Sequence, residues 1–246
     1  MTSEMRQRFF VIGTDTEVGK TTVSVALLKA AAAAGLPLLP FKPAVSGDLS
    51  DSSDHARLAR AVPELGLNGE AISVHRYEAA IAPGMAEPNH PFFEAQAEPA
   101  STSSRAIRAA RNALDALEER TETVATLIEG AGGLHVPMPG GTWLAEWIEA
   151  FDAQVIVVGR AGLGTLNHTI LTVEALRTLG RPPALFFLCC TQPDDLGLAN
   201  DNRRVLEARL GIPCAGILPH RPDPDTHDPS PRWLRADLFA SLGLER

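Results

Sequence analysis

The sequence predicts a doubly wound α/β fold, a mostly parallel sheet of about seven strands with helices on both faces. Short apolar runs alternate along the chain with longer segments of helical character, as in repeated strand–helix units. The runs are continuously apolar, which is typical of strands buried on both faces. With 246 residues and 45% hydrophobic residues, we expect residues 1–246 to form one domain with a large core.

The elements follow in chain order. Apolar runs predict strands at residues 9–12, 37–42, 124–128, 154–159, 184–190 and 214–218. Between them, helices are expected near residues 23–30, 54–62, 106–120, 167–179, 199–210 and 231–242. Residues 47–103, with a Pro-rich part at 82–91, are predicted to form a long loop and helical insertion. Such a connection is usually a lid or a substrate loop, and a surface insertion without a role is the alternative.

The composition limits the partners. The net charge is −8, from 22 basic and 30 acidic residues, so a nucleic-acid partner is not expected. The first eight residues lack the apolar stretch of a signal peptide, and the run at 184–190 is too short to span a bilayer. Two of the three cysteines are adjacent, which does not suggest a disulfide framework. We therefore expect a cytoplasmic protein without a membrane partner.

The most informative segment is Gly13-Thr14-Asp15-Thr16-Glu17-Val18-Gly19-Lys20-Thr21-Thr22. It lies between the first predicted strand and a helix, the context of a phosphate-binding P-loop, so the fold is expected to be P-loop NTPase-like. Backbone N–H groups of the loop and the helix start can surround an anion. Lys20 can reach the terminal phosphates, and the Thr21 hydroxyl can ligate magnesium. Five residues separate Gly13 from Gly19, where four are usual. A plain tight turn, the alternative, would not need the Lys-Thr pair.

Polar residues also follow other strands, and ligands of such sheets bind at the carboxyl ends of the strands. Lys42 would face the phosphates there or remain solvated. Asp51 and Asp54 could cap the next helix or supply a magnesium ligand. Glu129 ends an apolar strand before Gly130-Ala131-Gly132-Gly133, which fits a second metal-holding position.

A further helix start, at residues 162–169, carries free N–H groups that could bind a carboxylate or a phosphate. A plain strand-to-helix turn would look the same in sequence.

In this order, the motifs resemble the dethiobiotin synthetase family. The segments that carry the resemblance are residues 13–21, 42–47, Asp54, 129–133 and 163–169, and it extends over about residues 8–220, with the five-residue loop spacing included. It implies a homodimeric, magnesium- and ATP-dependent ligase of biotin biosynthesis. Such an enzyme converts 7,8-diaminononanoate (7,8-diaminopelargonate) and CO2 to dethiobiotin through a carbamate and a carbamic–phosphoric anhydride.

The resemblance also implies roles for single residues. Lys20 and Lys42 would be catalytic, on the phosphates and the carbamate. Thr21, Asp54 and Glu129 would hold Mg2+. Ser46 would contact the substrate, and Thr165, Leu166 and Asn167 would bind its carboxylate across the dimer interface. The implied nucleotide-binding residues are Glu17, Val18, Gly19, Lys20, Thr21, Thr22, Asp54, Glu129, Gly130, Ala131, Gly132, Cys189, Cys190 and Pro219.

Two segments depart from the family pattern. At the position where the family commonly contacts adenine through an Asn-Asp pair, this chain has Cys189-Cys190-Thr191-Gln192. Thiols are poor hydrogen-bonding partners for the edge of a purine. Relaxed base selectivity is therefore expected. Residues 77–88 lack a clear match to the family's substrate-side loop.

Three other kinds of protein are alternatives to this family. A partition-type regulatory ATPase normally carries an extra lysine where this chain has Thr14, and it often ends in a membrane-binding helix. An amidotransferase-linked synthetase needs a glutaminase domain, for which the chain is too short. An inactive relative is not favoured, because Lys20, Lys42 and Glu129 are all present.

Overall fold

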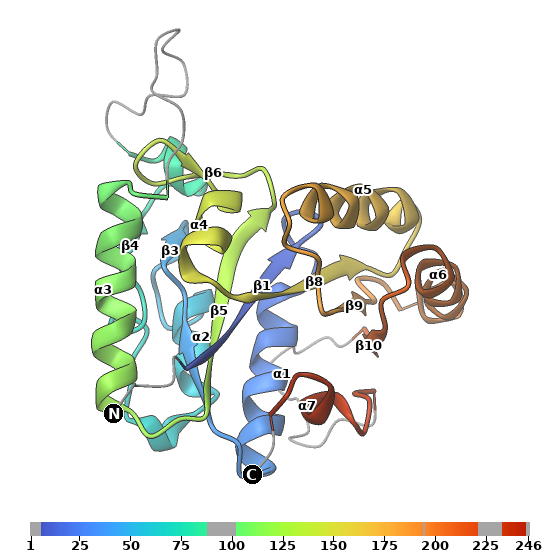
Figure 1. Ribbon diagram of the computed structural model, residues 1–246, viewed down its shortest axis with the longest axis horizontal. Coiled ribbons are helices and arrows are strands. Elements are labelled where there is room, and N and C mark those ends of the chain that lie inside the picture. The colour runs from blue at the N-terminus through green and yellow to red at the C-terminus, as the bar shows by residue number, and fades with distance from the viewer. Residues whose placement is uncertain (1–5, 88–101, 194, 221–232, 245–246) are drawn as a thin grey trace, which may run out of the picture.

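The computed structural model describes residues 6–87, 102–193, 195–220 and 233–244. Its centre is a six-stranded parallel sheet in the order β10-β9-β8-β1-β5-β2 (Figure 1). These strands are β1 (Gln7–Gly13), β2 (Leu38–Phe41), β5 (Ala125–Gly133), β8 (Gln154–Arg160), β9 (Leu185–Cys189) and β10 (Cys214–Leu218). The helices are α1 (Lys20–Ala33), α2 (Asp54–Arg60), α3 (Arg105–Arg120), α4 (Leu144–Phe151), α5 (Thr165–Thr178), α6 (Asp195–Leu210) and α7 (Leu238–Ser241).

Smaller elements complete the described part of the chain. Strand β3 (Ala44–Ser46) pairs with β4 (His75–Tyr77), and β6 (Pro137–Met138) pairs with β7 (Thr142–Trp143). Two short 3-10 helices are η1 (Pro63–Leu65) and η2 (Pro83–Met85). Together with α2, the elements β4, η1 and η2 fall within the expected insertion at 47–103, whose residues 88–101 lie outside the described part.

The predicted fold class is confirmed, because the sheet is buried under helices on both faces. Along β1, Phe10 and Ile12 join a core with α3, α4, α5 and α6, whereas Phe9 and Val11 join a second core with α1, α2 and α7. This alternation is the period of a strand with two apolar sides. All six predicted strands lie in the central sheet. The expected total of about seven was one too high for that sheet.

Some boundaries differ from the predicted ones. Strand β5 continues past Glu129 to Gly133, because its end still pairs with β1 through Gly13. Helix α4 was not predicted, although it buries Trp147 and Phe151. The last helix, expected at 231–242, is only α7 in the described part of the chain. Leu234 instead forms a bridge to Gly216 in β10, so the backbone before α7 is extended.

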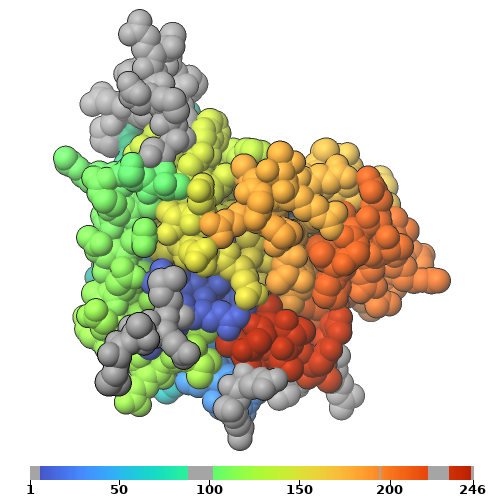
Figure 2. All heavy atoms as spheres, in the orientation of Figure 1, coloured from blue at the N-terminus to red at the C-terminus, as the bar shows by residue number. Residues whose placement is uncertain are grey.

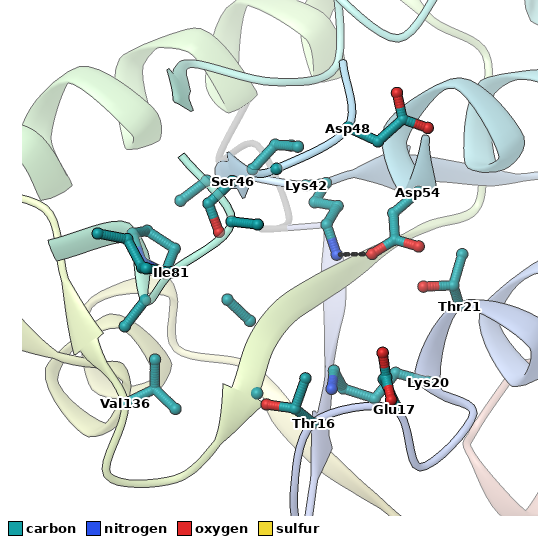
Figure 3. A pocket seen from close by; sticks show the side chains of 18 of the residues that line it. Thr16, Glu17, Lys20, Thr21, Lys42, Ser46, Asp48, Asp54, Ile81 and Val136 are labelled. Atoms are coloured by element: carbon teal, nitrogen blue, oxygen red, sulfur yellow. Dashed lines mark ion pairs between the residues drawn. The ribbon is translucent and has the colours of Figure 1, made fainter. Parts of the chain in front are cut away.

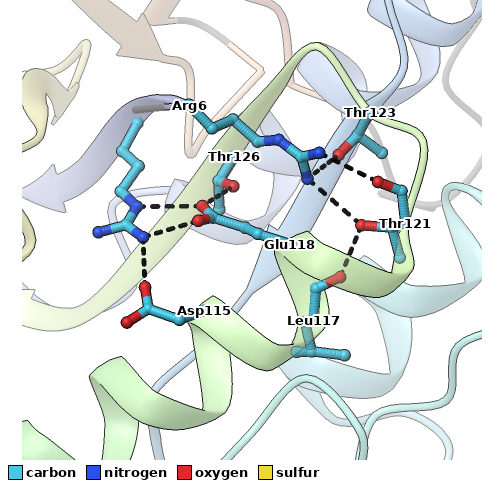
Figure 4. A network of polar contacts seen from close by, with 8 residues as sticks. Arg6, Asp115, Leu117, Glu118, Thr121, Thr123 and Thr126 are labelled. Atoms are coloured by element: carbon cyan, nitrogen blue, oxygen red, sulfur yellow. Dashed lines mark hydrogen bonds and ion pairs between the residues drawn. The ribbon is translucent and has the colours of Figure 1, made fainter. Parts of the chain in front are cut away.

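A polar network joins α3 to the amino ends of the sheet strands (Figure 4). Arg8 in β1 donates to both carboxylate oxygens of Glu118, at 3.0 and 2.6 Å, and to Asp115 at 2.6 Å. Thr126 in β5 donates to Glu118 at 2.6 Å, and Arg6 donates to Thr123 at 2.9 Å. This network stabilises the end of the sheet opposite to the one where the predicted site residues gather.

No helix in the described ranges combines the length and the apolar character needed to cross a membrane.

Candidate active site

The P-loop connects β1 to α1 and is held from the neighbouring strands. The Thr14 amide donates to the carbonyl of Val158 in β8 at 2.9 Å. Gly19 caps α1 with φ 96°, and a Cβ atom there would lie 2.7 Å from Cys189 Sγ of β9. Both the positive φ and the contact with Cys189 require glycine at this position. Glu17 also adopts a positive φ, 57°, which is uncommon for a residue with a side chain.

Lys20 is buried at the start of α1, and its ammonium group lies 3.3 Å from the carbonyl oxygen of Asp15. Burial, together with the nearby charge of Lys42, lowers the pKa of Lys20 to about 8. The Asp15 carboxylate forms an ion pair with Arg160 at the end of β8, at 2.9 Å. The P-loop is therefore held at Asp15 through both the carbonyl oxygen and the carboxylate of this residue.

Lys42 lies at the centre of the polar cluster shown in Figure 3. Its Nζ atom is 2.6 Å from Glu129 Oε1 and 3.2 Å from Asp54 Oδ2. Thr21 Oγ1 donates to the same Glu129 oxygen at 2.8 Å. The sequence left open whether Lys42 is solvated, and the structure answers this: the side chain is only 5% exposed and is directed into the site.

Lys42 and each of its two carboxylate partners, Glu129 and Asp54, stabilise the ionised forms of one another. Burial acts to lower the pKa of Lys42, but the carboxylates of Glu129 and Asp54 outweigh it and hold that pKa above its ordinary value. In turn, Lys42 is the main reason why the pKa of Asp54 falls to about 2, against the opposing effect of burial. Asp54 is therefore ionised at neutral pH and available to a cation.

Asp54 does not cap its helix. The N-cap of α2 is Ser53, whose hydroxyl accepts from the Ala56 amide at 3.4 Å, and Asp51 lies outside the helix in an exposed turn. The capping alternative for the two aspartates was therefore wrong. Because Ser53 satisfies the helix start, the Asp54 carboxylate faces the site instead.

These groups open into a cavity of about 680 Å³ at the carboxyl ends of β1, β2 and β5. One side is polar and carries Lys20, Thr21, Lys42 and Asp54. The other side is largely apolar and is formed by Ala44, Val45, Ala80, Ile81, Ala82, Pro83 and Val136. Ile81 and Val136 lie across the cavity from the charged cluster (Figure 3).

Glu87 anchors the apolar wall. Its carboxylate accepts from the Tyr77 hydroxyl at 3.2 Å and from the Gly140 amide at 2.6 Å. Gly84 in η2 packs directly against the backbone of Met138, where a larger residue would clash. The wall is thereby attached both to β4 and to the β6–β7 hairpin.

The structure brings most of the predicted site residues together. Those that line the cavity are Glu17, Gly19, Lys20, Thr21, Thr22, Lys42, Ser46, Asp54, Ala131 and Gly132. Glu129 is fully buried beside it, Val18 belongs to the core, and Gly130 packs against Phe10 and Leu144. Cys189, Cys190, Pro219 and Thr165 to Asn167 are not among its lining residues. The Cys189 thiol lies 3.9 Å from the Gly19 carbonyl oxygen, beneath the P-loop.

Sequence reasoning missed several lining residues. Arg57 could have been found, because it follows Asp54 by three residues on a predicted helix and so shares its face. No local pattern marked Ile81 or Val136, since isolated apolar residues in loops resemble ordinary surface positions.

The donors present fit a magnesium ion. Glu129 Oε2 is buried without a hydrogen-bond partner in the described part of the protein, and its other oxygen lies beside the Thr21 hydroxyl. Two carboxylates and a hydroxyl are hard oxygen donors, and magnesium usually takes few protein ligands and keeps water and phosphate oxygens. No cluster of three or more His, Cys, Asp or Glu residues occurs in the ranges that the structure describes, so an all-protein cage is not seen there.

A glycine loop between the first strand and first helix of a parallel sheet, with Lys-Thr at the helix start, defines a P-loop nucleotide-binding protein. Solved structures agree on the fold. The FtsY protein of Thermotoga maritima has a TM-score of 0.50 at 14% identity, over 93% of this chain and 67% of that one. The receptor FtsY of Elizabethkingia anophelis also has a TM-score of 0.50, at 12% identity, over 93% and 64%.

The sequence comparisons are more specific. Residues 7–228 match the AAA domain family. The ATP-dependent dethiobiotin synthetase of Anaeromyxobacter dehalogenans (strain 2CP-C) is 44% identical over 87% of this chain and 90% of its own length. That of Photobacterium profundum is 35% identical over 89% and 94%. The chain belongs to the ATP-dependent dethiobiotin synthetase family.

Proposed function

We propose that the protein is an ATP-dependent ligase of biotin biosynthesis that forms dethiobiotin from 7,8-diaminononanoate and CO2. The observation that supports this function is one cavity that combines a P-loop, a buried Lys42 and an apolar wall. The chain that forms it is 44% identical to the ATP-dependent dethiobiotin synthetase of Anaeromyxobacter dehalogenans (strain 2CP-C). A triphosphate and an anionic carbamate must meet there, and fixed cations stabilise their approach.

The reaction has three steps. One amine of the substrate adds to CO2 and loses a proton, which gives a carbamate. A carbamate oxygen then attacks the γ-phosphorus, the bond to the β-phosphate oxygen breaks, and ADP leaves. The second amine attacks the carbamoyl carbon of this mixed anhydride and loses a proton, phosphate departs, and the ureido ring closes.

The residues of the chain mainly bind and orient the reactants. The P-loop amides and Lys20 hold the phosphates at the start of α1. Lys42 supplies a fixed charge where the carbamate meets the γ-phosphate, and Ser46 contacts the diamine end. The apolar side, with Ile81 and Val136, accommodates the hydrocarbon chain. When bound, magnesium would be held by Thr21, Asp54 and Glu129 and would neutralise phosphate oxygens.

A homodimer is part of the proposal. Thr165, Leu166 and Asn167 lie at the start of α5, outside the lining of the chain's own cavity. Beside them Leu163 is 94% exposed, and Leu171 is exposed on the same helix. Helices α5 and α6 lie side by side at the surface (Figure 2), and α6 adds the exposed Leu196, Leu198 and Val205. A second copy covering this face would bring Thr165 to Asn167 to the partner's substrate.

The dimer is tested by light scattering of the wild type and of Leu163→Asp. The wild type should be a dimer, and the variant should shift towards monomers with a raised KM for the diamine. A fully active monomer at assay concentration would contradict the shared site.

The function is tested by measuring phosphate release with diaminononanoate, bicarbonate, magnesium and ATP, and by identifying the product by mass spectrometry. Phosphate release should require the diamine and should match dethiobiotin formation in a one-to-one ratio. ATP hydrolysis at the same rate with and without the diamine would instead favour the alternative function, a partition-type regulatory ATPase. A location in the cytoplasm, where ATP is available, remains part of the prediction.

A further inference from the structure

Arg57 is a third cation at the phosphate side of the cavity. It lies one turn along α2 from Asp54, and its side chain is 14% exposed. It lines the same cavity as Lys20, Thr21 and Lys42. An arginine in this position shares the space in which the terminal phosphates are proposed to lie.

The charges around Asp54 show how Arg57 differs from Lys42. Asp54 Oδ2 faces Lys42 at 3.2 Å, whereas Asp54 Oδ1 faces Arg57 Nη1 at 4.0 Å, the outer limit of an ion pair. Lys42 is also bound to the fully buried Glu129 at 2.6 Å, so its ammonium is held by two carboxylates. Of the two cations, Arg57 has the longer contact to Asp54, and both line the cavity.

The chemistry of the guanidinium also suits a phosphate. Its planar fork matches two oxygens of a phosphoryl group, and it keeps its charge at every pH at which proteins are folded. Arg57 therefore provides a permanent positive charge in the cavity that Lys20, Lys42 and Asp54 also line.

We propose that Arg57 binds the γ-phosphate of the nucleoside triphosphate and holds it during transfer to the carbamate. This extends the proposed function, because it rests on the cavity being the nucleotide site. It makes Arg57 a binding residue that distinguishes a triphosphate from a diphosphate.

The experiment measures nucleotide affinity by calorimetry with magnesium and without the diamine. The probes are adenosine 5′-(β,γ-imido)triphosphate and ADP. The variants are Arg57→Gln, Arg57→Lys and, as a matched control, Arg60→Gln, which lies one turn further on the same helix. Arg60 is exposed, its guanidinium donates to the Asp51 carbonyl, and it does not line the cavity.

Arg57→Gln should lower the affinity for the triphosphate analogue roughly tenfold or more, the scale of one charge-assisted hydrogen bond, and change that for ADP by less than about twofold. Arg57→Lys should restore part of the loss, and Arg60→Gln should leave both affinities unchanged. An equal loss for both nucleotides would mean that Arg57 acts only by supporting Asp54, and no loss for either would mean that it does not touch the nucleotide. Either result overturns the proposal. Since no diamine is present, the outcome does not depend on whether the ligase reaction is observed.

Discussion

Replacing Lys42 by methionine tests whether the polar cluster is a coupled unit. The change removes the ammonium group and keeps an unbranched side chain of similar length. Glu129, which is 0% exposed, then keeps the Thr21 hydroxyl, 2.8 Å from Oε1, and the longer-range attraction of Lys20 within the described part of the protein. Breaking a buried pair by removing one partner costs about 3–5 kcal/mol, because the remaining charge is uncompensated. The half-exposed Asp54 adds little to this loss, because solvent screens it.

The assay is urea and thermal unfolding of the wild type, Lys42→Met and the double variant Lys42→Met/Glu129→Gln. For a chain of this length, about 2–4 °C per kcal/mol predicts a melting temperature lower by about 6–20 °C in Lys42→Met. The double variant should recover most of the lost stability, because the amide of glutamine carries no charge to leave unpaired.

Ligase activity separates the two roles of Lys42. Turnover should fall at least about a hundredfold in both variants, the scale of losing one preorganised charge donor. The reasoning is refuted if Lys42→Met is as stable as the wild type, or if the double variant is less stable than the single one. Near-normal turnover in the stable double variant would refute the catalytic role.

The pKa of Lys20 is lowered to about 8, and a bound triphosphate favours the charged form of this lysine, so nucleotide binding should take up about three quarters of a proton at pH 8.5 and about a tenth at pH 7. Calorimetry in buffers of different ionisation enthalpy measures this proton uptake. Equal uptake at both pH values would contradict the prediction. Asp54→Asn should raise the magnesium concentration for half-maximal nucleotide binding by about tenfold, the scale of one weakened ligand. The control variant Asp51→Asn should leave the magnesium titration unchanged. A normal titration for Asp54→Asn would show that Asp54 is not a magnesium ligand. If, as the family resemblance implies, Cys189 and Cys190 replace a bidentate contact to adenine, then CTP, GTP and UTP should support activity within about tenfold of ATP. A preference for ATP above about a hundredfold would show this to be wrong.

Local sequence was sufficient for the P-loop and for the sheet. A loop that binds phosphate needs residues adjacent in the chain, so the segment from Gly13 to Thr22 could be read directly. The parallel sheet followed from continuous apolar runs, and its geometry brings strand ends to one edge. For this reason Lys42 and Glu129, each at the end of a predicted strand, were correctly expected at the same edge of the sheet.

Contacts between distant residues could not be read in this way. Lys42 and Glu129 are 87 residues apart, so neither their 2.6 Å contact nor the burial of Lys42 has a local signature. Ser53 and Asp54 are both good helix caps, and only the fold decides which side chain turns to the backbone and which to the cavity.

The same reason explains the remaining differences. Within the helix predicted at 231–242, Leu234 instead pairs with β10, a neighbour that no local pattern reveals. Ile81 and Val136 form an apolar wall only because separate loops meet there. The sequence by itself determined the phosphate loop, the parallel sheet and the edge at which its chemistry collects, since these depend on local pattern and backbone geometry. The tertiary structure alone decided which charges are buried together, because desolvation and pairing depend on residues far apart in the chain.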